Sequence, residues 1–144
     1  MAMMHKRTLG ILLCAVVLAA GLNGCATGKA HVSSEAAIRE TLAAWKAGLE
    51  SHNLDRIMSV VSEEFVSGDG GSKADFRSYV ARLIDDGTLS GAKMNIETAR
   101  VTIEKDMATV ENVVLSGDRG SAQLEMDLKK ESGGAWRIVG LEAY

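Results

Sequence analysis

Alternating polar and apolar residues run through the last third of the chain, and this pattern constrains the fold more than any other feature. Between residues 123 and 129 the apolar side chains Leu124, Met126 and Leu128 alternate with polar or charged ones. Successive side chains of a β-strand point to opposite faces, so this strand has one core face and one solvent face. Segment 92–144 contains four such strands separated by polar turns. We therefore predict an antiparallel sheet covered on one face.

The first two predicted strands form a hairpin around the turn at residues 105–106. Pairing outward from that turn places Val101 opposite Val110 on one face. Farther from the turn the apolar positions change face on both strands, near Thr98 and near Val113. A β-bulge or sharp bend explains both changes, because an extra residue shifts the alternation and curves the sheet. We expect helices on the concave side of this bent sheet, with a pocket between them.

Three helices are predicted before the sheet, from apolar residues that recur at spacings of three and four. The first begins near Ser33, Asn53 is placed to cap the second, and Ser72 with Asp75 forms a capping box for the third. Residues 65–67 are predicted to form a short strand. The three apolar stripes are Ile38, Leu42, Trp45 and Leu49; Leu54, Ile57, Met58 and Val61; and Phe76, Val80, Leu83 and Ile84.

The N-terminal 24 residues have the parts of a secretory signal. Lys6 and Arg7 are the only charged residues before Cys25, and Leu9–Leu22 is an apolar run of 14 residues. That run is too short for a transmembrane helix, which takes about 20 apolar residues. We therefore predict that residues 1–24 are a cleaved signal peptide.

The residues Leu22-Asn23-Gly24-Cys25 resemble the lipobox of bacterial lipoproteins, with Asn23 as a departure from the usual pattern. In that family the cut falls before the cysteine, which carries a diacylglyceryl group and, in many bacteria, a further acyl chain on its amino group. The resemblance implies that Cys25 is lipidated and that residues 25–34 are the lipidated cysteine and a linker. Two or more acyl chains hold a protein stably on a membrane. Plain secretion and an uncleaved anchor are the alternatives.

The expected location is the cell envelope. Ala26, rather than Asp, follows the lipobox cysteine. By resemblance to Gram-negative lipoproteins, this residue implies sorting to the outer membrane, facing the periplasm, in a host that has one.

Composition excludes several other functions. Without the two basic residues of the signal, 14 basic residues stand against 19 acidic ones, a net charge of −5, so phosphate neutralisation and nucleic-acid binding are not expected. The only cysteines are Cys14, inside the signal, and Cys25, which leaves no disulfide or zinc–thiolate site. His31 and His52 lack metal-ligand spacing, so we predict no metal and no other cofactor.

The chain after the signal resembles nuclear transport factor 2-like domains across residues 35–144. The resemblance lies in the helix end and turn at 45–55, the acidic pair before an aromatic residue at 62–65, and the last two strands with their Gly-Gly turn at 127–138. It implies an α+β fold, a cone in which N-terminal helices pack on a curved antiparallel sheet around a pocket. That fold hosts isomerases, dehydratases, polyketide cyclases and non-enzymatic binding modules, so it does not decide the function.

A ketosteroid isomerase-like site needs a carboxylate base and an oxyanion pair of Tyr and protonated Asp. The resemblance places Asp69 at the base, Asp127 near the oxyanion acid, and Trp45 at the tyrosine position. Trp cannot replace the phenol as an acid, and Asp127 alternates with core residues and so belongs on the outer face. Asp69 in a Gly-rich loop has the composition of a turn. We therefore keep Asp69 and Asp127 only as candidates and assign no catalytic residue.

Four residues are candidates to line the pocket: Trp45 on the first helix, Tyr79 on the third, Asn112 at the sheet bend and Met126 on the core face. For Asn112 the alternative is a polar residue that only shapes the bend. For Tyr79 it is a core-edge aromatic with its hydroxyl in water.

The outer sheet face is polar through Glu125, Asp127 and Lys129, while Val139 and Leu141 are expected to add apolar surface to it. Such a face leaves open a homodimer or another envelope assembly. A pocket enzyme of the isomerase, dehydratase or cyclase type is also open. We favour a lipid-anchored, non-catalytic module that binds a small apolar molecule or a protein.

Overall fold

The computed structural model describes residues 32–144, so the predicted signal peptide (1–24), Cys25 and most of the linker 25–34 lie outside the described residues. Three helices come first: α1 (Ser34–Glu50), α2 (Leu54–Ser59) and α3 (Lys73–Asp85). Five strands follow: β1 (Lys93–Asn95), β2 (Arg100–Glu104), β3 (Met107–Gly117), β4 (Gly120–Lys130) and β5 (Trp136–Ala143). The predicted α+β fold, with helices first and an antiparallel sheet second, is confirmed. No helix in this part of the chain is long and apolar enough to cross a membrane.

The strands form one antiparallel sheet in the order β1-β3-β4-β5, with β2 also paired to β3. β1 and β2 occupy different halves of β3: Asn95 lies opposite Val114, and Arg100 lies opposite Glu111. The sequence predicted four strands. The structure has five, because the first predicted strand is interrupted between Asn95 and Arg100, next to the predicted change of face.

A β-bulge in β3 bends the sheet where the sequence predicted a bend. Val110 pairs with Met126 and Val113 pairs with Leu124, so β3 advances three residues while β4 advances two. Asn112 lies in this extra segment with a φ of 60°. This left-handed conformation is uncommon for residues with a side chain, and Asn tolerates it better than most.

A second bulge lies in β5, and the sequence did not predict it. The register with β4 shifts between Asp127 and Leu128 and leaves Val139 without a partner on β4. The extra residue changes the face of the residues that follow. Leu141, expected on the outer face, instead lies opposite the buried Met126 and belongs to the helix-covered side.

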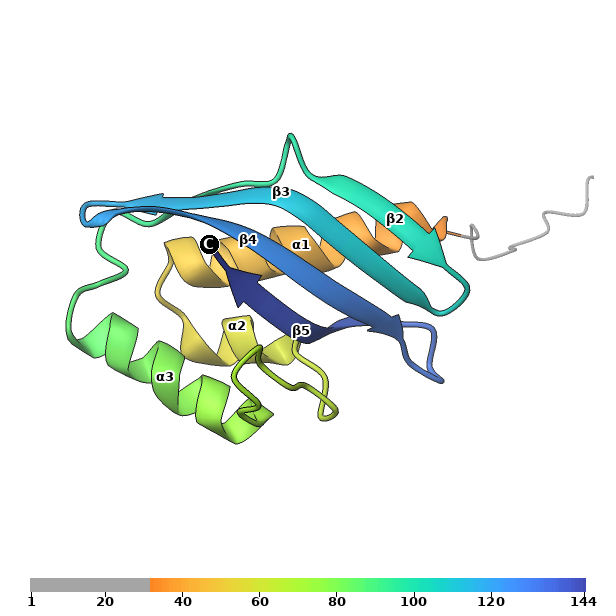
Figure 1. The fold of residues 1–144 in the computed structure, drawn as a ribbon, viewed down its shortest axis with the longest axis horizontal. Helices are drawn as coiled ribbons and strands as arrows, with labels where there is room; N and C mark the ends of the chain where they lie inside the picture. The colour runs from red at the N-terminus through yellow and green to blue at the C-terminus, as the bar shows by residue number, and fades with distance from the viewer. Residues whose placement is uncertain (1–31) are drawn as a thin grey trace, which may run out of the picture. The chain divides into compact units, whose positions relative to one another are not determined.

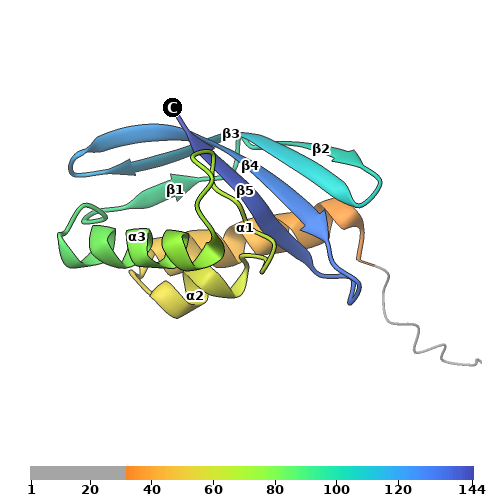
Figure 2. The same cartoon turned by 60° about the horizontal axis from the view of Figure 1, so that its bottom comes forward.

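All three helices lie on the same face of the sheet (Figures 1 and 2). The core between these layers contains the predicted stripes of the helices, including Trp45, whose side chain is only 2% exposed. Met126 is 0% exposed whereas its neighbour Asp127 is exposed, as predicted. The buried residues of the sheet are Met94, Ala108, Val110, Val113, Leu124, Met126, Leu128, Trp136 and Ile138. Residues 32–144 belong to one compact unit.

The predicted helix caps are present. The side chain of Ser33 accepts a hydrogen bond from the backbone N–H of Ala36, Asn53 caps α2, and Ser72 and Asp75 form the capping box of α3. The strand predicted at residues 65–67 is absent from the described chain. That segment makes one isolated bridge, between Val66 and Ser72, and the Val66 N–H donates to the Val139 carbonyl of β5 at 3.0 Å.

Candidate functional site

A cavity of about 360 Å³ lies between the C-terminal half of α1, α3 and the hairpin of β3 and β4. Its volume falls within the range of small-molecule sites, about 300–1,000 Å³. Most of its wall is apolar, and residues of α1, α3, the loop after α3, the β3–β4 hairpin and β5 all line it. These apolar residues include Trp45, Phe76, Val80, Leu83, Leu89 and Leu141. The curved sheet therefore encloses space instead of packing completely against the helices.

Polar residues of the cavity gather near the β3–β4 turn. Arg119, in that turn, donates a hydrogen bond to Thr88 Oγ1 at 3.0 Å and another to the Asp86 carbonyl at 3.1 Å. Ser116 and Ser121, on the two strands beside the turn, also line the cavity. These two bonds fix the guanidinium between the hairpin and the loop that follows α3.

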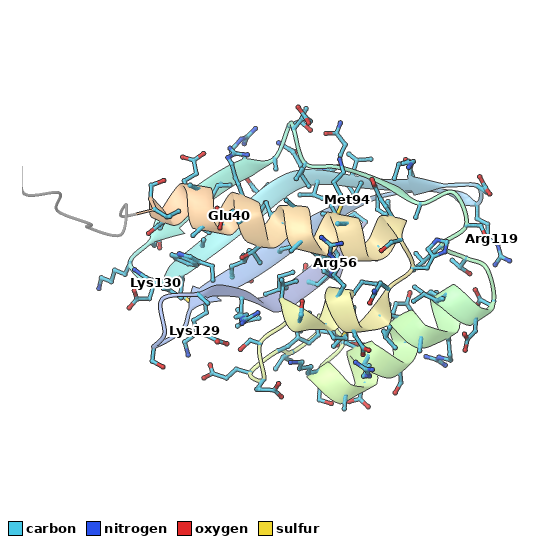
Figure 3. All side chains as sticks on the ribbon, turned by 180° about the vertical axis from the view of Figure 1, so that it is seen from behind. Glu40, Arg56, Met94, Arg119, Lys129 and Lys130 are labelled. Atoms are coloured by element: carbon cyan, nitrogen blue, oxygen red, sulfur yellow. The ribbon has the colours of Figure 1, made fainter. Side chains whose placement is uncertain are left out.

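Arg119 lies at the end of the domain opposite Lys129 and Lys130 (Figure 3). It is the only charged residue that lines the cavity within the described part of the chain. The cavity thus combines an apolar body with one cationic group.

The described lining contains no Asp, Glu, His, Lys or Cys. General acid–base catalysis needs a proton-transfer group within hydrogen-bond reach of the substrate. Tyr79 does line the cavity, but its side chain is 49% exposed and its ring lies 5.9 Å from the guanidinium of Arg82. As far as residues 32–144 are concerned, the wall therefore offers no carboxylate or imidazole to act as a base.

Asp69, the candidate base, lies in the exposed loop before α3 and does not line the cavity. Its carboxylate accepts a hydrogen bond from the Ser67 hydroxyl and a longer one, 3.4 Å, from the Gly71 N–H. The Ser67 bond, followed by the Gly71 bond, holds the pKa of Asp69 below its ordinary value of 3.8. A base that works near neutral pH needs the opposite shift. The carboxylate stabilises the turn.

Asp127, the candidate oxyanion acid, is exposed on the outer face of the sheet. The Thr109 hydroxyl donates to its carboxylate at 3.0 Å, and Gly140 lies opposite it on β5. An oxyanion acid must be kept neutral by an apolar site, and this position is solvated. Neither candidate carboxylate shares the cavity with Trp45.

Two of the four predicted pocket residues line the cavity, namely Trp45 and Tyr79, and two do not. The bulge turns the Asn112 side chain to the outer face, where its Oδ1 accepts a hydrogen bond from Gln123 Nε2 at 3.1 Å. Met126 is enclosed by the core and has no surface at the cavity. Arg119 was missed by sequence reasoning. A lone Arg in a polar turn carries no signal that it lies beside a cavity.

The indole nitrogen of Trp45 is the one buried side-chain polar atom without a hydrogen-bond partner among the described residues. A buried donor without a partner costs about 1–3 kcal/mol. Trp45 also forms part of the cavity wall.

No group of three or more His, Cys, Asp or Glu side chains within residues 32–144 is arranged to hold a metal ion. His52 lies 2.7 Å, through Nε2, from the carbonyl oxygen of Leu89. This contact joins the turn after α1 to the loop after α3.

No family model and no curated protein matches the sequence. Solved structures do match its fold. A protein of unknown function with a cystatin-like fold from Nostoc punctiforme aligns with a TM-score of 0.63 and 17% identity, covering 76% of this chain and 88% of the other. An NTF2-like protein of unknown function from Shewanella baltica aligns with a TM-score of 0.61 and 20% identity, covering 79% and 96%.

A third structure, a candidate ketosteroid isomerase from Shewanella frigidimarina, aligns with a TM-score of 0.60 and 16% identity over 75% of this chain and 94% of the other. The fold is NTF2-like. Sequence identities of 20% or less show that the fold is shared and say nothing about the activity. Any activity must therefore be argued from the cavity.

Proposed function

We propose that this chain is a lipid-anchored protein of the cell envelope whose NTF2-like domain is a non-catalytic module that binds a small apolar molecule. One observation carries the binding role: a cavity of about 360 Å³ with a largely apolar described wall that contains no carboxylate or imidazole. Apolar surface that leaves water on binding contributes about 25 cal/mol per Å². The wall thus favours an apolar ligand, and its described part provides no carboxylate or imidazole that would act on that ligand as a base.

The anchor is supported by the sequence around Cys25. Ala26–Ser34 is a linker of nine residues that spans at most about 30 Å when extended. A domain on this tether would stay close to the membrane surface, where small apolar molecules enter and leave the bilayer. The proposed anchor would therefore keep the cavity close to the membrane, where the proposed apolar ligand is found.

Native mass spectrometry of residues 31–144, purified without detergent, tests the binding role. We expect one small molecule per chain, released when the protein unfolds. Ala122→Trp, which places a large side chain in the cavity, should abolish the adduct. The matched control is Val114→Trp, because Val114 is exposed on the neighbouring strand and does not line the cavity. An adduct that survives Ala122→Trp in a folded protein contradicts the proposed site.

A homodimer through the outer sheet face is compatible with this role. That face carries hydrogen-bonded pairs on neighbouring strands, such as Thr109 with Asp127 and Asn112 with Gln123. Sedimentation equilibrium of the same fragment measures the stoichiometry directly. A dimer that Gln123→Lys dissociates would assign the interface to this face, and a monomer at all concentrations would exclude it.

A further inference from the structure

The charge of the cavity lining indicates which class of small molecule the cavity would bind. This inference rests on the proposed binding function. We propose that the ligand is an amphipathic monoanion, a single-chain carboxylate, with its hydrocarbon chain against the apolar wall and its carboxylate on Arg119. The cavity has one charged lining group in the described chain, and that group is a cation.

Arg119 has unused hydrogen-bonding capacity. A guanidinium has five N–H donors, and Arg119 uses two of them, for the Thr88 hydroxyl and the Asp86 carbonyl. Both acceptors are neutral. Within residues 32–144 no carboxylate lies within 4 Å of Arg119, although six ion pairs form elsewhere. The cation at the cavity is thus free to form the two parallel hydrogen bonds that a carboxylate accepts from Arg.

The position of this cation is fixed before a ligand arrives. The two hydrogen bonds join the β3–β4 turn to the loop after α3, so the side chain is held where the hairpin meets the cavity. Thr88, whose hydroxyl accepts one of these two bonds, also lines the cavity. An ordered donor loses less conformational entropy on binding than a free one.

Two acidic neighbours bear on the argument. Arg119 contributes to the lowered pKa of Asp86, after the larger effect of hydrogen bonds with Thr88, so its charge is felt by that carboxylate. Asp118 precedes Arg119 in the same turn. Neither aspartate lines the cavity, but both reduce the positive potential outside it. The carboxylate is therefore held by direct contact with the guanidinium and not by long-range attraction, which salt also screens.

Three ligands with the same chain and different headgroups test the proposal: decanoate, decanol and decylamine, each titrated calorimetrically into residues 31–144 below its micellar concentration. We expect decanoate to bind one per chain and about tenfold more tightly than decanol, the lower range for a hydrogen bond to a charged group. Decylamine should bind more weakly than decanol. Arg119→Gln should weaken decanoate about tenfold and leave decanol unchanged.

Arg100→Gln is the matched control, because Arg100 is exposed on β2 and does not line the cavity; it should change none of the three affinities. Arg119→Lys keeps the charge without the two-pronged geometry and should retain part of the preference for decanoate. If Arg119→Gln fails to fold, the proposal is tested by the ratio of decanoate affinity to decanol affinity. This ratio should be about tenfold in the unmodified protein and smaller in Arg119→Lys.

The outcomes separate this inference from the function on which it rests. Equal affinities for decanoate and decanol, or tightest binding of decylamine, overturn the carboxylate and leave an apolar-ligand module. Binding of none of the three probes, with no adduct in native mass spectrometry, overturns the binding function itself. Decanoate binding that Arg119→Gln leaves intact also overturns the assignment.

Discussion

Gln123 on β4 donates a hydrogen bond from Nε2 to Oδ1 of Asn112 on β3, with the two atoms 3.1 Å apart. Asn112 lies in the bulge between Val110 and Val113, with its backbone in the left-handed region. The bond ties the side chain of the strained residue to the outer face. The bulge therefore bends the sheet around the cavity without placing a polar side chain inside it.

The first prediction concerns this strained position. Asn112→Val should destabilise the domain by about 1–3 kcal/mol, because a β-branched residue is strongly disfavoured at positive φ. Asn112→Gly should cost much less, since Gly adopts this conformation freely and only the bond to Gln123 is lost. Urea unfolding of the two variants measures the difference. Equal losses of stability would mean that the hydrogen bond, and not the backbone conformation, holds the bulge.

Trp45 should contribute mainly to packing. Trp45→Ala removes a buried aromatic side chain and should lower the free energy of unfolding by about 3–5 kcal/mol. Trp45→Phe should cost clearly less than Trp45→Ala, because it keeps most of the apolar volume and removes the unpaired indole N–H. Denaturant unfolding gives both values. A Trp45→Phe loss as large as that of Trp45→Ala would show that the indole N–H has a partner in solution.

Acid should destabilise the domain through its hydrogen-bonded aspartates. The pKa values of Asp69, Asp75 and Asp86 lie below their ordinary value of 3.8, chiefly because of hydrogen bonds from Ser67, Ser72 and Thr88 respectively. In acid the unfolded chain therefore binds more protons than the folded one. The contribution of these aspartates to the free energy of unfolding is complete at pH values above 3.8 and is lost as the pH falls through their lower folded-state pKa values.

Thermal unfolding followed from about pH 5 to about pH 2 measures this loss. Asp69→Asn should make the decline of the melting temperature shallower. Asp106→Asn removes an exposed carboxylate in the β2–β3 turn and is the control. The turn assignment of Asp69 would be wrong if the two variants gave identical profiles.

Cys25 should decide where the full-length protein is found. We expect the unmodified chain to fractionate with membranes and to incorporate labelled fatty acid. Cys25→Ser should remove the label and release the chain from the membrane or block its processing. Cys14→Ser, inside the predicted signal peptide, should leave labelling and fractionation unchanged. A Cys25→Ser protein that stays labelled would exclude the proposed anchor.

Local patterns in the sequence were enough for the helices and for one bend. The caps at Ser33, Asn53 and Ser72 depend on residues within a few positions of each other, and the change of face near Val113 is visible in the alternation itself. The same pattern could not give the left-handed backbone of Asn112, which sends its side chain away from the cavity. The bend was therefore predicted correctly. The predicted pocket role of Asn112 was not supported, because its side chain bonds to Gln123 and does not line the cavity.

The features that the sequence did not give depend on distant partners. The bulge at Val139 shifts the face of Leu141, and it exists only in the register between β4 and β5. Arg119 meets Thr88 and the Asp86 carbonyl across separations of 31 and 33 residues. Spacing rules for helices and strands contain no information about such pairs.

Helix α1 separates the N-terminal linker from the cavity along its length. The helix begins at Ser34, next to the linker, whereas Leu49, near its other end, forms part of the cavity wall. At 1.5 Å per residue these two positions are about 22 Å apart. An attachment through the N-terminus, whether to the proposed lipid or to a sensor chip, would therefore join the domain far from the cavity that we propose as the ligand site. A change in the proposed tether would then leave the geometry of the cavity unaltered.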